Sequence, residues 1–194
     1  MSQTSASLLG RVQADPQSPA WVRLVELYEP LVRGWLRRHE VLAHDADDLV
    51  QEVLAVVVRR LPEFQHNQRV GAFRAWLRTI TVNVLRDHWR GGKRRPAATG
   101  TSDFQELLAQ LEDPASGMSQ LWDQEHDRHV TRRLLEMLKG EFEPRTWQAF
   151  SMVALEGNSP AEVAARLGLS VNAVFIAKSR VLARLRQEAE GLID

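Results

Sequence analysis

Residues 156–180 read EGNSPAEVAARLGLSVNAVFIAKSR, and this stretch predicts two short helices joined by a tight turn. Ser159 suits the N-cap of the first helix, and Glu162, three residues later, completes a capping box. Gly168 suits the sharp turn after that helix, and Ser170 can cap the second helix. A short helix, a tight turn and a second capped helix form the helix-turn-helix pattern.

The second helix of this segment is the candidate DNA-reading element. In a helix-turn-helix it lies in the major groove, with its N-terminal residues nearest the base edges. The residues expected to meet DNA are Ser170, Asn172, Ala173, Ile176, Lys178, Ser179 and Arg180, with Arg184 expected at phosphate or solvent. The residues expected to form the small core are Val163, Leu167, Leu169, Val171 and Val174. An ordinary helical hairpin that binds no DNA is the alternative interpretation.

Helical periodicity extends over the rest of the chain. Apolar residues recur at steps of three and four, which places them on one face of a helix. Such stripes predict helices over residues 19–38, 45–61, 72–90, 104–111, 130–139, 144–156, 160–167 and 171–190. Phe73 and Trp76 lie on one of these stripes, which indicates that they pack in the core. The predicted fold class is all-α.

A small, polar run at residues 96–102, PAATGTS, divides the chain. Runs of this composition are typical of linkers. The sequence therefore predicts two small helical domains, over residues 1–95 and 130–194, joined by an acidic linker over residues 96–129.

Charge is sorted along the chain, although its 25 basic and 25 acidic side chains cancel. Residues 40–53 hold five acids and residues 103–127 hold seven, and neither segment contains Lys or Arg. Residues 66–95 hold eight basic residues and one acid, and residues 163–186 hold five basic residues and no acid. Two separated positive segments indicate two contacts with a polyanion.

The sequence DADDLVQEV at residues 45–53 opens a predicted helix with a cluster of carboxylates. Hard cations prefer several oxygen ligands, so a metal site is one interpretation. A solvated helix start is the second, because acids favour the positive end of the helix dipole. A docking surface for a basic partner is the third.

Residues 73–95, FRAWLRTITVNVLRDHWRGGKRR, interleave basic and aromatic side chains. Phosphates attract Arg and aromatic rings stack on unpaired bases, so this segment suits nucleic acid with exposed bases. The polar loop at residues 63–71, which comes before it, suits a single extruded base.

Several classes of site are excluded or not expected. The chain has no cysteine, which excludes disulfides, thiolate metal sites and cysteine nucleophiles. No apolar run is long enough to span a membrane and the N-terminus lacks a secretory pattern, so the expected location is the cytoplasm. His126 and His129 stand near two acids, but on a polar stretch they are expected to be solvated. No cofactor, metal or catalytic residue is expected.

Three motifs together resemble the extracytoplasmic-function (ECF) sigma factors of bacterial RNA polymerase. They are DADDLVQEV at residues 45–53, FRAWLRTITVNVLRDHWR at residues 73–90 and SPAEVAARLGLSVNAV at residues 159–174. The resemblance covers residues 20–95 as sigma region 2 and residues 130–188 as sigma region 4. It implies a protein that binds core RNA polymerase and directs promoter recognition, DNA melting and transcription initiation, with no reaction of its own. It also implies promoter DNA and an anti-sigma factor as partners.

The resemblance also implies roles for individual residues. Polymerase binding is implied for Asp45, Asp48, Gln51 and Glu52. Contact with the minus-ten element is implied for Phe64, His66, Asn67, Arg69, Arg74, Arg78, Asn83, Arg86, His88 and Arg90. Contact with the minus-thirty-five element is implied for the second helix of the helix-turn-helix. The acidic linker is implied to thread towards the RNA exit path, where negative charge mimics nucleic acid.

One departure from the family concerns that second helix. A common family pattern runs V-G-T-V-K-S-R after the turn, whereas here Val171-Asn-Ala-Val is followed by Phe175-Ile-Ala, and Lys178-Ser-Arg comes three residues later. Its contacts therefore do not carry over one for one. Two other functions fit parts of the sequence: a helix-turn-helix repressor that acts without polymerase, and a magnesium-dependent DNA-processing enzyme that uses the acids of residues 45–52.

Overall fold

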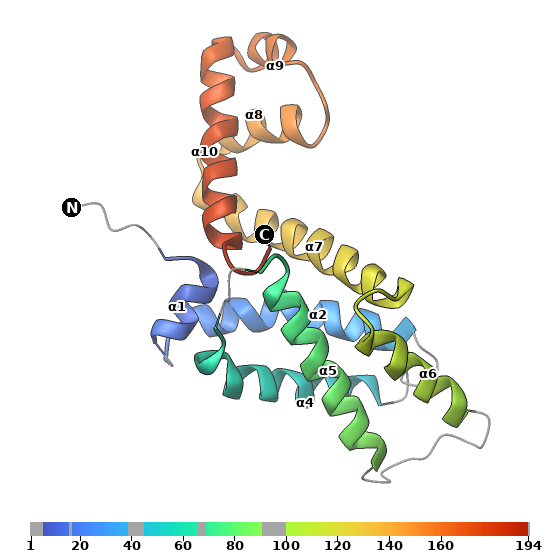
Figure 1. Cartoon of the computed structure of the whole chain (residues 1–194). Helices are drawn as coiled ribbons and strands as arrows, with labels where there is room; N and C mark the ends of the chain where they lie inside the picture. Colours follow the sequence, from blue (N-terminus) through green and yellow to red (C-terminus); the bar gives the residue numbers. More distant parts are fainter. Residues whose placement is uncertain (1–5, 16, 39–44, 66–68, 91–99, 194) are drawn as a thin grey trace.

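The computed structural model describes residues 6–15, 17–38, 45–65, 69–90 and 100–193, and these parts of the chain form helices without any strand (Figure 1). The helices are α1 (Leu8–Ala14), α2 (Ala20–Arg38), α4 (Ala46–Arg60), α5 (Ala72–Arg90), α6 (Gly100–Glu112), α7 (Gly117–Leu138), α8 (Pro144–Ala154), α9 (Pro160–Leu167) and α10 (Val171–Ala189). Short 3-10 turns at Leu61–Glu63 and Lys139–Glu141 follow α4 and α7. The predicted all-α fold is confirmed.

The larger of two cores lies among α1, α2, α4, α5, α6 and α7. The ring of Tyr28 on α2 packs 5.3 Å from that of Phe73 on α5. The ring of Trp35, also on α2, packs edge-on at 4.9 Å against Trp122 of α7. All four side chains are buried, and Trp76 is half-buried at the edge of the same core. Core packing of Phe73 and Trp76 is therefore confirmed.

The segment expected to be a linker contains two helices that belong to this core. α6 buries Phe104 and Leu111, and α7 continues unbroken through residue 130, where the second domain was expected to begin. The small, polar run at residues 96–102 indicated a linker, and a helix was expected over residues 104–111. The apolar residues after that run recur at helical spacing and pack against α5 and α2. The assignment of separate functions to residues 1–95, 96–129 and 130–194 stays a prediction.

A short N-terminal helix, α1, is absent from the sequence predictions because seven residues are too few to show a clear period. The side chain of Ser7 caps it by accepting a hydrogen bond of 3.1 Å from the backbone nitrogen of Gly10. Leu8 and Val12 are fully buried in the larger core. The helix therefore belongs to the folded unit, and it also contacts α10 through an ion pair between Arg11 and Glu188.

The smaller core holds α8, α9 and the first half of α10 together. Val163 and Val174 are buried in it, and Leu167 and Leu169 pack at its edge. The prediction that Val171 belongs to this core is wrong, since its side chain is 42% exposed. The buried layer of α10 begins at Val174, one turn after the start of the helix.

α10 runs from the smaller core to the larger one (Figure 1). Its C-terminal half contacts α7 and α1, and Leu192, just beyond the helix, is buried in the larger core. Among the described residues, no helix taken alone combines the length and the apolar character that a membrane crossing requires. α9 and α10 meet those two criteria only as a pair, and they are bent by 105°.

Candidate nucleic-acid interface

The turn between α9 and α10 has the geometry that the sequence predicts. The hydroxyl of Ser159 accepts a hydrogen bond from the backbone nitrogen of Glu162 at 3.3 Å, and the Glu162 carboxylate accepts one from the backbone nitrogen of Ser159 at 3.0 Å. These contacts hold the pKa of Glu162 below its ordinary value. Gly168 has a φ of 60°, which glycine adopts without steric strain. Ser170 caps α10 by accepting from the backbone nitrogen of Ala173 at 3.1 Å.

Arg145, near the start of α8, stabilises this turn from outside. Its guanidinium donates to the carbonyl oxygens of Leu167 and Gly168, the second at 3.2 Å. Carbonyl groups at a helix end lack partners within the helix, so this contact satisfies them. The 105° bend between α9 and α10 is the angle that a helix-turn-helix requires. The first half of α10 is therefore presented as a preformed surface.

Most of the residues expected at the minus-thirty-five element are accessible on that surface. The exposed ones are Ser170, Asn172, Ile176, Ser179 and Arg180, and the half-buried ones are Ala173 and Lys178. Phe175, which the sequence prediction left out, is 51% exposed on the same stretch. Its position next to Ile176 and three residues after Asn172 was the signal that could have found it, because residues three apart lie on one side of a helix.

Arg184 differs from the other predicted residues because its guanidinium is bound within the protein. It lies 2.9 Å from the carboxylate of Glu141 and also pairs with the fully buried Glu188. Arg11 of α1 donates two hydrogen bonds to the same Glu188 carboxylate, at 3.0 and 2.8 Å. Burial alone would raise the pKa of Glu188, but the two arginines outweigh burial and hold that pKa below its ordinary value. A contact between Arg184 and DNA stays a prediction, and it requires these ion pairs to open.

The basic side of α5 is covered by two acids of α7, Asp123 and Asp127, which we call the α7 acid pair. Arg78 is only 7% exposed, and its guanidinium lies 2.7 Å from Asp123. Arg74 lies 3.4 Å from Asp123 and 2.9 Å from Asp127. Burial would raise the pKa of Asp127, but His126 and Arg74 outweigh it and keep that pKa low. Two arginines predicted to contact the minus-ten element are thus neutralised by the predicted linker segment.

The predicted residues in the second half of α5 are more accessible. Asn83 and Arg90 are exposed. Arg86 is half-buried, and its guanidinium pairs with Glu112 of α6 and lies 3.4 Å from the side-chain oxygen of Asn83. This end of the helix therefore offers a polar surface, beside which α6 makes an ion pair with Arg86 and stacks Phe104 on Trp89 with ring centroids 4.2 Å apart.

A cavity of about 450 Å³ opens beside the start of α5. Phe64, Arg69 and Trp76 are among its lining residues, and the Phe64 and Trp76 rings pack 4.9 Å apart. Gly71, also in the lining, has a φ of 74°, and a Cβ there would lie 2.6 Å from the guanidinium carbon of a neighbouring arginine. Aromatic walls beside an exposed cation suit a stacked nucleobase. Two further candidates of this loop, His66 and Asn67, lie outside the described residues.

The start of α4 presents a polar face to solvent. Asp48, Gln51 and Glu52 are exposed, and their spacing of three and four residues puts them on one side of the helix. Asp45 is half-buried just before α4, with its carboxylate 3.5 Å from Nε2 of the half-buried His88 at the end of α5. Within the described ranges, no group of three or more histidine or acidic side chains is placed to hold a metal ion.

The prediction that His126 and His129 are solvated is wrong. His126 is fully buried, with Nε2 3.2 Å from the Tyr28 hydroxyl and Nδ1 2.9 Å from Asp127. Nε2 of His129 lies 2.8 Å from the carbonyl oxygen of Leu27, and burial lowers the pKa of this histidine. Polar composition suggested solvation, but α7 packs its polar residues against α2, where each imidazole finds a partner.

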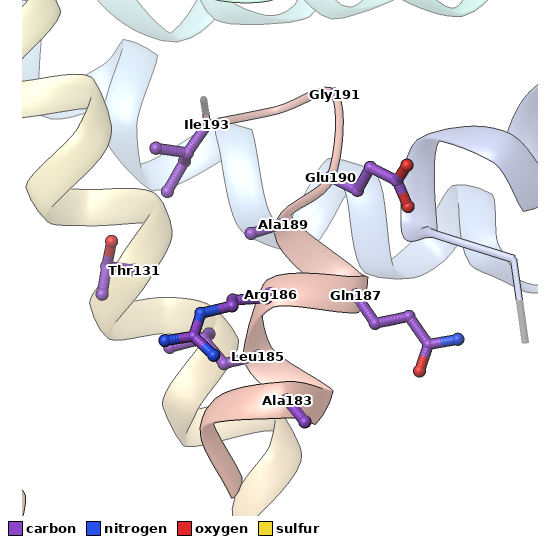
Figure 2. A pocket seen from close by; sticks show the side chains of 9 residues that line it. All are labelled: Thr131, Ala183, Leu185, Arg186, Gln187, Ala189, Glu190, Gly191 and Ile193. Carbon is purple, nitrogen blue, oxygen red and sulfur yellow. The ribbon is translucent and has the colours of Figure 1, made fainter. Parts of the chain in front are cut away.

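Two larger cavities lie along α7. Figure 2 shows the first, of about 720 Å³, between Thr131 of α7 and a segment from Ala183 to Ile193 that comprises the end of α10 and the residues after it. The second, of about 700 Å³, is lined by residues of α7 and by Trp147 and Leu155. Both are lined by residues that the sequence analysis did not assign to a site.

Comparisons with known proteins identify the family. Residues 24–95 match the family model for Sigma-70 region 2. The chain is 30% identical over 144 residues to the RNA polymerase sigma-E factor of Streptomyces coelicolor, an overlap of 74% of this chain and 71% of that protein. It is 29% identical over 159 residues to the ECF RNA polymerase sigma factor SigE of Mycolicibacterium smegmatis, an overlap of 80% and 56%. It is 28% identical over 155 residues to the RNA polymerase sigma factor CnrH of Cupriavidus metallidurans, an overlap of 77% and 74%.

The chain thus spans little more than half of SigE, and about three quarters of CnrH. The family model covers α4, α5 and most of α2, the elements that carry the exposed acidic face and the basic helix. The order of motifs in the sequence, the helical fold and these similarities all indicate the same family. The chain belongs to the ECF RNA polymerase sigma factors of the sigma-70 family.

Proposed function

We propose that this protein joins core RNA polymerase, recognises the minus-ten and minus-thirty-five elements of promoters, and supports DNA melting and transcription initiation. The observation that carries the proposal is the combination, in one chain, of a Sigma-70 region 2 match and a preformed helix-turn-helix. Sigma factors are regulatory proteins, so no chemical reaction is assigned. A repressor acting alone would have no use for the acidic face of α4.

The acidic face of α4 is the proposed contact with polymerase. Asp48, Gln51 and Glu52 form one accessible polar surface, and Asp45 adjoins it at the start of the helix. Its negative charge suits a basic surface on the partner, because complementary charges steer and orient docking. The protein is proposed to act in the cytoplasm, where the polymerase transcribes, and a partner of the anti-sigma class stays a prediction.

The cavity beside α5 is the proposed site for one flipped base of the minus-ten element. Phe64 and Trp76 supply aromatic surface, and the exposed Arg69 can meet a phosphate. Asn83 and Arg90 extend the same contact along α5. Since the α7 acid pair covers Arg74 and Arg78, we propose that α7 moves away from α5 when the protein engages polymerase and single-stranded DNA.

The exposed side of α10 is the proposed reader of the minus-thirty-five duplex. Asn172 and Arg180 are exposed and carry groups that hydrogen-bond to base edges. Positive charge in residues 163–186 provides attraction to phosphates. Figure 1 shows the first half of α10 at a distance from α5 and the larger core, and Asn172 and Arg180 are exposed there with α7 in its present place.

Replacing Asp48 and Gln51 with Ala is expected to weaken binding to core RNA polymerase about 10- to 30-fold, since each lost polar contact is worth roughly 1 kcal/mol. Both side chains are exposed, so the fold should be unchanged. Affinity for polymerase is measured by fluorescence anisotropy with a labelled protein. The matched control is Asp103→Ala with Gln105→Ala, which removes an exposed acid and an exposed amide from α6. Equal affinities for both double variants would contradict the docking role.

A further inference from the structure

The first half of α10 exposes one continuous face. Val174 and Ala177 point into the smaller core and are buried. The residues between and beside them that remain exposed are Val171, Asn172, Phe175, Ile176, Ser179 and Arg180. This face begins at the capped start of the helix, which is the part that lies nearest the base edges in a helix-turn-helix.

Two large apolar side chains stand side by side in the middle of this face. Phe175 is 51% exposed and Ile176 is 44% exposed, whereas Val174 beside them already fills the core. Leaving this much apolar surface in water is unfavourable, by about 25 cal/mol for each Å² that a partner would cover.

The charge near these side chains favours a polyanion as the partner. Residues 163–186 carry five basic residues and no acid. Arg184 among them is held by Glu141 and Glu188, whereas Arg180 is exposed one helical turn beyond Ile176. Ile176 and Arg180 also line one hollow of about 200 Å³, in which Arg145 adds a second positive charge and Glu143 one negative charge. A neutral lipid or an uncharged protein helix would satisfy the apolar pair alone, whereas duplex DNA satisfies both the apolar pair and the cations.

Thymine is the base that presents an apolar group in the major groove, its 5-methyl group, and apolar side chains, including that of phenylalanine, contact it there. We propose that Phe175 and Ile176 are specificity-determining residues that contact thymine methyl groups in the minus-thirty-five duplex. This inference rests on the proposed function of α10. It adds that two positions of the element are read through apolar contact, while Asn172 and Arg180 read their neighbours through hydrogen bonds.

The test uses the full chain and duplexes that the wild-type protein selects from a randomised pool. In the selected duplex each thymine is replaced in turn by deoxyuridine, which removes only the methyl group. At one or two positions this change should weaken binding of the wild-type protein about fourfold, equivalent to ~0.8 kcal/mol for one buried carbon. At such a position, the variant Phe175→Ala or Ile176→Ala should bind the thymine duplex and the deoxyuridine duplex with equal affinity. Leu155→Ala, which shortens another exposed apolar side chain, should keep the fourfold difference.

The outcomes separate this inference from the proposed function. Arg180→Ala weakens binding to the selected duplex if α10 lies in the groove. If Arg180→Ala weakens binding but no deoxyuridine substitution changes the affinity of the wild type, the proposed contact with thymine methyl groups is overturned, while DNA binding by α10 stands. If no duplex is selected at all, both are overturned. A dimer in light scattering that Phe175→Ala dissociates would also overturn the inference, because a second copy would then occupy the face.

Discussion

Replacing the α7 acid pair with Asp123→Asn and Asp127→Asn should raise the affinity of the free protein for single-stranded minus-ten DNA about tenfold. In the wild type these carboxylates neutralise Arg74 and Arg78, which must be released before they contact phosphate. The double variant removes three such ion pairs, each worth roughly 0.5 kcal/mol, so their combined loss of about 1.5 kcal/mol shifts the equilibrium towards the uncovered form about tenfold. Asparagine keeps the size of the side chain and removes its charge. Affinity is measured with a fluorescent single-stranded oligonucleotide.

The control removes the same charge elsewhere. Asp103→Asn with Glu106→Gln neutralises two exposed acids of α6, so it reports the general effect of a more positive protein. The α7 variant should gain clearly more affinity than this control. Equal gains would show that general charge explains the effect, and they would contradict the idea that α7 covers a DNA-binding surface. Circular dichroism establishes that both variants keep their helices.

Glu188→Gln should lower the free energy of unfolding by about 2–3 kcal/mol at neutral pH. Breaking a fully buried ion pair costs about 3–5 kcal/mol. We expect a loss at or just below the bottom of that range, because Arg11 and Arg184 are partly exposed to water. Glutamine retains hydrogen bonding but removes the carboxylate charge that pairs with Arg11 and Arg184, although Arg184 keeps its ion pair with Glu141. The loss is measured by chemical denaturation, and it should be accompanied by detachment of α1 from the end of α10.

The effect of this substitution should depend on pH in one direction. The folded-state pKa of Glu188 is lowered, so its stabilisation is complete above the unfolded-state value of about 4.3 and disappears as pH falls through the lower folded-state value. The wild type and Glu188→Gln should therefore converge in stability in acid. Glu190→Gln, an exposed neighbour, should stay within about 0.5 kcal/mol of the wild type throughout. A gap between the wild type and Glu188→Gln that is independent of pH would contradict the ion-pair explanation.

The helix-turn-helix was predictable because its signals are local. A cap needs only Ser159 and Glu162, three residues apart, and the turn needs only a glycine that tolerates positive φ. The structure confirms both caps, the turn and the length of α9. The row of apolar residues on α5 was predictable for the same reason, because its spacing is read within one helix. Phe73 is buried as that spacing predicts.

Contacts between distant segments were not predictable from the sequence. Arg78 and Asp123 are 45 residues apart, and Arg11 and Glu188 are 177 apart, so no spacing rule brings them together. The basic run in α5 indicates affinity for a polyanion, yet in the free protein Arg74 and Arg78 of this run form ion pairs with carboxylates of α7. The burial of His126 has the same origin, because its partner Tyr28 lies on another helix.

The account is tested most directly by run-off transcription with purified core RNA polymerase, this protein and a library of promoter fragments. It predicts transcripts with defined start points that appear only when the protein is added, and that weaken when Asp48→Ala and Gln51→Ala replace the wild type. Including the variant Asp123→Asn with Asp127→Asn provides a form in which the DNA-binding surface of α5 is uncovered. Absence of both transcripts and polymerase binding with the wild type and with this variant would contradict the account.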